Sequence, residues 1–263
     1  MKKILFIISG ELFLRNYIRT GVIDYLSKNY DCKIIADRKI YNKVVVEKLE
    51  NFAGYYISDP KEFDKRRNLM SVISWRYRKK STLFIFRIMR FTGLRDLNFF
   101  SSLRQFKVFI SYVKRNLNRN SKLLQMIYGN LFIFPFFIFF YRLRLTLNKS
   151  LEKYVESLKP DLILFPSSAF DPIGYDILEI SRKKKVKTIF LIDNWDNLCS
   201  KTVFLRKPDF ITVWGRQSLE HGVKIQGLRE KQIITIGTPR FNIYYKTLNN
   251  PPKSPIKGNI FSL

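Results

Sequence analysis

Short apolar runs alternate with helical patterns at both ends of the chain. Two of the runs, residues 162–165 and 189–192, contain no polar residue, which is typical of strands buried on both faces. Strands of this kind separated by helices indicate an α/β domain with a doubly wound parallel sheet. The pattern predicts seven strands, at residues 3–9, 32–36, 54–58, 161–166, 188–193, 210–214 and 233–236.

Between the third and fourth predicted strands the pattern is helical, with few Gly or Pro residues to break it. We expect this segment, at about residues 62–158, to be a helical insertion after the third strand. The helices predicted in this region are 71–91, 99–117 and 123–158. A further helix is predicted at 217–221, ended by Gly222.

Basic residues are concentrated in the same insertion. The 263 residues carry 48 Lys and Arg against 21 Asp and Glu, a net charge of +27, which excludes an ordinary near-neutral enzyme. Residues 65–150 hold nineteen basic residues and one acidic residue, so +18 of this charge lies there, together with eighteen aromatic residues. A hydrophobic content of 46% excludes a disordered basic tail.

Residue types that hold metals and phosphates are scarce in the chain. Cys32 and Cys199 are too few for a disulfide framework, and His221 is the single histidine, so we expect no metal site. Neither GxGxxG nor GxxxxGK[ST] occurs, so we expect this chain to bind no cofactor. The five apolar residues after Lys3 are too short for a signal peptide, which indicates a cytoplasmic protein.

Polar residues follow four of the predicted strands, at the edge where a parallel sheet binds its ligands. Trp195 is expected to stack on a sugar or base. Alternatively, these segments are strand-to-helix turns whose Ser, Asp and Asn cap the next helix, with Trp195 in the core. The candidate substrate-binding residues are Gly10, Ser167, Ser168, Asp171, Asn194, Trp195, Asn197, Thr238 and Arg240.

Three carboxylates at this edge are candidates for catalysis: Glu11, Asp193 and Asp196. Glu11 follows Gly10, so a tight turn would aim it across the top of the sheet. Partial burial would raise its pKa from about 4.3 toward a working pH suited to a general base. Alternatively, Glu11 is a solvated residue in the first turn of a helix, where the helix dipole favours it, and one of the two aspartates is a cap.

Four segments resemble the N-terminal half of GT-B-fold glycosyltransferases of bacterial surface-polysaccharide biosynthesis and the related CDP-glycerol glycerophosphotransferases. They are 13–21 (FLRNYIRTG), 193–201 (DNWDNLCSK), 213–215 (VWG) and 236–242 (IGTPRFN). The resemblance covers about residues 1–60 and 160–245. Its most specific element is the Gly-Thr-Pro-Arg turn, and Asn242 stands where Asp is commoner in the family.

The resemblance implies a Rossmann-like acceptor-side domain at residues 1–246, with Arg15 and Asn16 among its substrate-binding residues. It further implies a Pro-rich linker at 247–258 and, at 259–263, the stump of a second domain. The nucleotide-sugar donor would bind to that missing C-terminal half, so we expect this chain to be truncated and inactive alone.

The implied function is glycosyl transfer from a nucleotide-activated sugar to a lipid-linked or saccharide acceptor in cell-envelope polysaccharide biosynthesis. One alternative is half of a CDP-glycerol-type glycerophosphotransferase. Another, of a different class, is a non-catalytic basic protein that binds membrane surfaces or nucleic acid.

The nineteen uncharged residues 123–141 raise the question of a membrane. Their strictly apolar part, 131–141, would reach about 16 Å as a helix against about 30 Å of hydrocarbon. A complete crossing would also put two parts of one sheet on opposite sides of the bilayer. We therefore expect a shallow interfacial helix, which makes the protein peripheral on the anionic inner face of the cytoplasmic membrane.

The expected membrane-contact residues are Arg119, Lys122, Phe134, Phe136, Phe137, Phe139, Phe140, Arg142 and Arg144. An alternative is a core helix buried all round. Specific nucleic-acid binding is not expected, since a contiguous Phe run suits lipid better than it suits base stacking.

Overall fold

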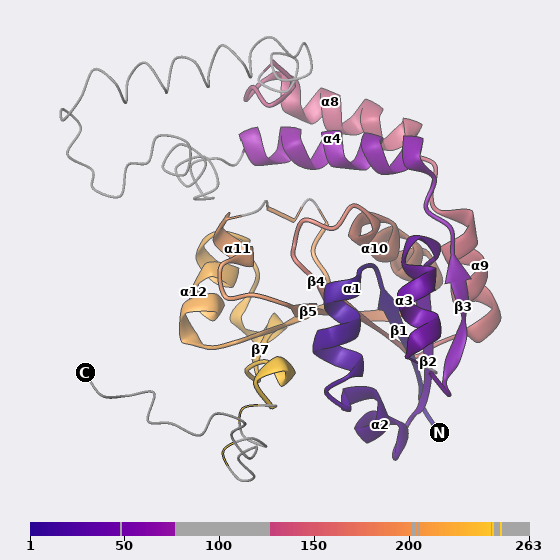
Figure 1. Cartoon of the computed structure of the whole chain (residues 1–263). Coiled ribbons are helices and arrows are strands. Elements are labelled where there is room, and N and C mark those ends of the chain that lie inside the picture. Colours follow the sequence, from indigo (N-terminus) through magenta and orange to yellow (C-terminus); the bar gives the residue numbers. More distant parts are fainter. Residues whose placement is uncertain are drawn as a thin grey trace, which may run out of the picture.

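The computed structural model describes residues 1–47, 49–76, 127–200, 203–204, 206–242, 244 and 248. Within them lies a seven-stranded, all-parallel sheet with the order β3-β2-β1-β4-β5-β6-β7 (Figure 1). The order reverses beside β1, which pairs with both β2 and β4. The strands are β1 (Lys3–Ile8), β2 (Asp31–Asp37), β3 (Phe52–Tyr56), β4 (Leu162–Ser167), β5 (Lys187–Ile192), β6 (Phe210–Val213) and β7 (Ile233–Thr235).

Helices cover both faces of this sheet. Alternate residues of β1 point to opposite sides, so Phe6 packs in one buried cluster and Leu5 in the other. The first cluster is covered by α1 (Glu11–Phe13), the π-helical turn η1 (Leu14–Ile18), α2 (Val22–Ser27) and α3 (Tyr41–Val46). The second is covered by α9 (Lys149–Leu158), α10 (Ile173–Lys184), α11 (Asn197–Ser200) and α12 (Arg216–Lys224).

Short 3₁₀ turns complete the domain: η2 (Arg38–Ile40), η3 (Glu230–Gln232) and η4 (Pro239–Phe241). Two further helices, α4 (Pro60–Arg76) and α8 (Ile133–Arg144), lie side by side beyond the sheet (Figure 1). They share a small core in which Leu69 and Ile73 of α4 meet Phe134 and Ile138 of α8. No helix in the described ranges is both long and apolar enough to cross a membrane.

The structure confirms the α/β class, the parallel sheet and all seven predicted strands. The single helix predicted at 123–158 is wrong. It is interrupted between Arg144 and Lys149, because Asn148 takes an extended conformation and caps α9 by accepting a hydrogen bond from Leu151 N (2.9 Å).

The helix expected at 71–91 begins earlier, at Pro60, and residues 77–91 and 99–117 lie outside the described part of the chain. Gly222 does not end α12, which continues to Lys224. A Cβ on Gly222 would lie 2.6 Å from Ile233 Cδ1, so this glycine lets α12 approach β7 closely. Of the predicted linker and second-domain stump, only Leu248 is described.

Candidate functional site

The loops at the carboxyl ends of β1, β5 and β7 meet on one side of the sheet. Ligands of open parallel sheets bind at this edge, near the point where the strand order reverses. The loop after β1 enters α1 and then η1, which contains Arg15 and Asn16. Isolated π-helical turns occur frequently at functional sites.

A hydrogen bond joins η1 to the end of β5. Asn16 Nδ2 donates to Asp193 Oδ1 (2.7 Å), and both residues are buried. Asp193 Oδ2 has no hydrogen-bond partner among the described residues. Burial raises the pKa of Asp193, an effect that Asn16 and the positive charges of Arg240 and Arg15 partly offset. Burial, with Asp193 nearby, also raises the pKa of Tyr17.

Arg240 in η4 joins the end of β7 to the ends of β5 and β6. Its Nη1 donates to Asn194 Oδ1 (2.9 Å), and its guanidinium carbon lies 4.9 Å from the ring centre of Trp214. Phe241 meets the same indole edge-on at 5.2 Å. The four segments that carry the family resemblance are therefore adjacent in the folded chain.

An open cleft of about 630 Å³ lies between η1 and η4. Its lining is basic and aromatic, and none of the described residues that line it carries a carboxylate. Arg19 forms an ion pair with Glu47 (2.6 Å), and Arg15 Nε donates to Asn16 Oδ1 (3.2 Å). The residues around the cleft are Arg15, Asn16, Arg19, Thr20, Arg240, Phe241, Asn242 and Tyr244.

The three predicted catalytic carboxylates have different surroundings. Glu11 is exposed in the first turn of α1 and lies 3.3 Å from Lys43 Nζ, so the expected partial burial is wrong and the alternative of a solvated first-turn residue is confirmed. Asp193 is fully buried. Asp196 Oδ2 accepts from Ser200 Oγ (2.8 Å), and the Asp196 carbonyl accepts from Ser200 N (2.9 Å) at the start of α11.

The neighbouring predicted residues also differ in their exposure to solvent. Trp195 is 48% exposed and is not a core residue, and its carbonyl accepts from Ser218 Oγ (3.3 Å). Asn197 is buried, as is Thr238 Oγ1, and neither side chain has a hydrogen-bond partner in the described ranges. Gly10 begins α1 with an extended backbone.

The segment after β4 does not join the cleft. Asp171 Oδ2 accepts from Ser168 N (2.6 Å) and from the Ser167 and Ser168 hydroxyls (3.1 Å each). This network supports Ala169 in the left-handed region (φ 62°). Leu69 of α4 lines a small cavity beside the segment. Ser167, Ser168 and Asp171 thus form a strand-to-helix turn, as in the alternative interpretation, but none of their side chains caps α10, whose N-cap is Pro172.

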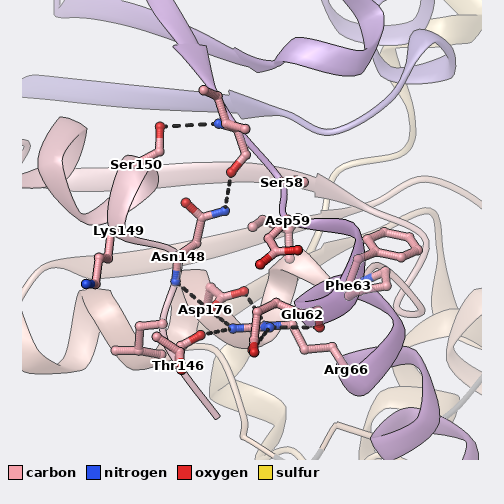
Figure 2. A pocket seen from close by; sticks show the side chains of 14 residues that line it. Ser58, Asp59, Glu62, Phe63, Arg66, Thr146, Asn148, Lys149, Ser150 and Asp176 are labelled. Atoms are coloured by element: carbon pink, nitrogen blue, oxygen red, sulfur yellow. Dashed lines mark hydrogen bonds and ion pairs between the residues drawn. The ribbon is translucent and has the colours of Figure 1, made fainter.

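A second cavity, of about 340 Å³, lies where α4 meets α9 and α10 (Figure 2). Arg66 at its base is buried and lies 2.6 Å from Asp176 Oδ2. The same guanidinium contacts Glu62 Oε2 (2.9 Å) and donates to the carbonyl of Thr146 (2.5 Å). Burial raises the pKa of Asp176 to about 6, although Arg66 opposes the shift. The sequence predicted none of these contacts.

The predicted membrane-contact residues lie on different sides of α8. Phe136, Phe139 and Phe140 are exposed, as are Arg142 and Arg144. Phe134 is buried within the protein, and Phe137 is half-buried and stacked on Tyr128 (4.7 Å). The alternative of a helix buried all round is therefore wrong. Arg119 and Lys122 lie outside the described residues.

In the described part of the chain, no three His, Cys, Asp or Glu side chains gather closely enough to hold a metal ion. A scan against protein-family models finds no match to the chain, and a search of curated proteins finds none either.

Proposed function

We propose that the cleft between η1 and η4 binds an acceptor saccharide and that the chain is the acceptor-side half of a GT-B-type glycosyltransferase. The observation that carries this proposal is the convergence of Asn16, Asn194 and Arg240 beside an open cleft at the carboxyl edge of the sheet. Amide and guanidinium groups donate hydrogen bonds to sugar hydroxyls, and exposed aromatic rings at the rim pack against sugar faces. The donor would be a nucleotide-activated sugar, and the product would contribute to cell-envelope polysaccharide.

Glu11 is the better candidate for the general base, since an acceptor hydroxyl can reach an exposed carboxylate. It precedes Arg15 and Arg19 by one and two turns on the same exposed side of α1 and η1, and Arg15 and Arg19 line the cleft. Asp193 is a positioning residue in this proposal: it is fully buried and holds the Asn16 side chain. In a full-length enzyme that contains this half, Glu11→Gln is expected to lower the rate of glycosyl transfer by about 10²-fold. The control variant Glu156→Gln, on α9, should leave that rate unchanged.

The three arginines of the cleft favour a second candidate, an anionic acceptor such as a polyol phosphate. Arg15, Arg19 and Arg240 carry positive charge, and among the described residues only Arg19 of the three has a carboxylate ion-pair partner, Glu47. Guanidinium groups bind phosphate oxygens through charge-assisted hydrogen bonds. This acceptor would suit the glycerophosphotransferase alternative.

Equilibrium binding distinguishes the candidates without any transfer reaction. Tryptophan fluorescence of the 263-residue chain, titrated with neutral mono- and disaccharides and with glycerol 3-phosphate, reports the site through Trp195 and Trp214. Arg240→Ala is expected to weaken binding about tenfold or more. Arg182→Ala, an exposed arginine at the far end of α10, is the matched control.

Saccharide binding that Arg240→Ala weakens supports the glycosyltransferase proposal. Binding of glycerol 3-phosphate alone would replace it with the second candidate. If neither class of ligand binds, or if the two arginine variants behave alike, the cleft is not an acceptor site.

A further inference from the structure

Five large apolar side chains form a continuous exposed stripe along α8 and the residue before it. Each is between 58% and 79% exposed. Their spacing of 4, 3, 1 and 3 residues places them on one side of a helix with 3.6 residues per turn. The stripe consists of Phe132, Phe136, Phe139, Phe140 and Leu143.

Within the described residues, this stripe is not part of the protein's core. The opposite side of α8 holds Phe134 and Ile138, which are buried against Leu69 and Ile73 of α4. An unpaired apolar stripe of this size on a surface helix marks an interaction site.

Positive charge borders the stripe on both sides. At about 100° of rotation per residue, Arg142 and Arg144 fall about 100° to either side of the centre of the stripe. Both side chains are exposed. The stripe itself contains no charged residue, and residues 65–150 carry nineteen basic residues and one acidic residue. An apolar stripe edged by arginines complements an anionic bilayer, in which hydrocarbon lies beneath a layer of phosphates.

We infer that α8 lies in the plane of an anionic membrane surface, with the five-residue stripe at the boundary of headgroups and acyl chains. Its 12 residues reach about 18 Å, short of the roughly 30 Å hydrocarbon layer, so the helix lies in the interface and does not span it. Arg142 and Arg144 would then extend to lipid phosphates on either side. This inference concerns where the chain is held, and it does not depend on the proposed transfer reaction.

Contacts on the protein side hold α8 in a defined orientation. The Tyr141 hydroxyl donates to the carbonyl of Lys65 on α4. At the next residue of α4, the ion pair of Arg66 with Asp176 attaches α4 to α10. The stripe is therefore presented by a helix pair that is fixed to the sheet domain, which gives the bound protein one orientation on the membrane.

Co-sedimentation with vesicles tests the inference. The chain is mixed with vesicles of phosphatidylcholine, with or without about 30% phosphatidylglycerol, at about 150 mM salt, where long-range charge effects are screened. Phe136→Ser combined with Phe140→Ser is expected to lower the membrane partition coefficient about tenfold or more. The matched control is Tyr25→Ser with Val46→Ser, two side chains that are at least as exposed but lie elsewhere. Neither pair is buried, so both variants should keep the melting temperature of the parent.

Arginine variants separate the charge from the apolar contact. Arg142→Gln with Arg144→Gln should weaken binding to the anionic vesicles and leave the weak binding to neutral vesicles unchanged. Arg182→Gln, on α10, should change neither.

Three results would overturn the inference. The first is equal sedimentation of the stripe variant and its control. The second is a concentration-dependent dimer that the stripe variant abolishes while vesicles fail to bind, which would assign the stripe to a second copy of the chain. The third is retention of single-stranded oligonucleotides at the same salt without vesicle binding. In each case, saccharide binding through Arg240 remains separately measurable.

Discussion

The ion pair of Arg66 with Asp176 offers the sharpest test of how the helix pair is attached to the sheet domain. In both residues the side chain is almost completely buried, with 4% and 2% exposed. Replacing Arg66 with Met leaves the Asp176 carboxylate buried without its cation. Loss of one partner from a buried pair costs about 3–5 kcal/mol, so we expect the free energy of unfolding at pH 7.5 to fall by that amount.

The double variant Arg66→Met with Asp176→Leu should recover most of the loss. It removes both charges together and fills the space with apolar groups, an exchange that is often neutral. Because Asn148 N then loses its acceptor on Asp176, we expect the double variant to lie within about 2 kcal/mol of the parent. Urea unfolding followed by far-UV circular dichroism measures all three proteins, and equal m-values validate the comparison.

The pH dependence follows from the raised pKa of Asp176, which is about 6 in the folded chain. The folded state takes up a proton as the pH falls through 6, whereas an unfolded aspartate does so near 4. The contribution of this group to stability is therefore present at low pH and is lost as the pH rises from about 4 to 6, by about 1.4 kcal/mol per unit. The parent should show this slope relative to Asp176→Asn.

The loss of unfolding free energy caused by Arg66→Met should accordingly be smaller at pH 5, where Asp176 is already neutral, than at pH 7.5. A single variant within 1 kcal/mol of the parent, or a double variant as unstable as the single one, would refute the reasoning. So would a penalty that does not change between the two pH values.

Two further substitutions test local geometry and the buried part of the site. Gly54→Ala should destabilise the chain by about 3 kcal/mol in urea unfolding, because the new Cβ would lie 2.2 Å from the Tyr154 hydroxyl at a φ of 142°. The control is Gly215→Ala, where a Cβ would have open space around it. Equal stability of the two variants would contradict this packing. Asn16→Ala should cost about 2–3 kcal/mol, since Asp193 loses its one hydrogen-bond donor in the described structure; a cost below about 0.5 kcal/mol would show that the carboxyl has another partner.

The sheet was predictable from the sequence because each strand is indicated by the apolar residues within it. The run Leu162-Ile163-Leu164-Phe165 is almost continuously buried, as its lack of polar residues predicts. The break before α9 was missed, because Asn148 interrupts an otherwise helical pattern with a side-chain cap and no Gly or Pro marks the site. The pairing of Arg66 with Asp176 has no local signal either, since the two residues are 110 positions apart.

The sequence predicted at which edge of the sheet the candidate site lies. It did not predict how deeply each residue is buried or every residue that lines the cleft. Strand ends located Asn194 and Arg240 correctly at one edge, where the structure joins them. The depth of Asp193 could not be predicted, because burial depends on how η1 packs over the strand end. Arg19, Phe241 and Tyr244, which line the cleft, were not among the candidates, although the first two lie within the segments that carry the resemblance.

The pairing of β1 with β4 bears on how the chain reaches its native state. Asp161 N donates to the carbonyl of Lys3, 158 residues earlier, and Asp161 Oδ2 accepts from Lys3 N. The parallel pairing continues from there, with Ile4 opposite Leu162. During synthesis, β1, β2 and β3 can associate early, but β1 keeps an open apolar edge until residues 57–161 and β4 have left the ribosome. Long-range parallel pairing of this kind closes slowly and leaves strand edges exposed to aggregation. We expect the nascent chain to depend on chaperones during that interval, and a circular permutant that begins near α9 to shorten it.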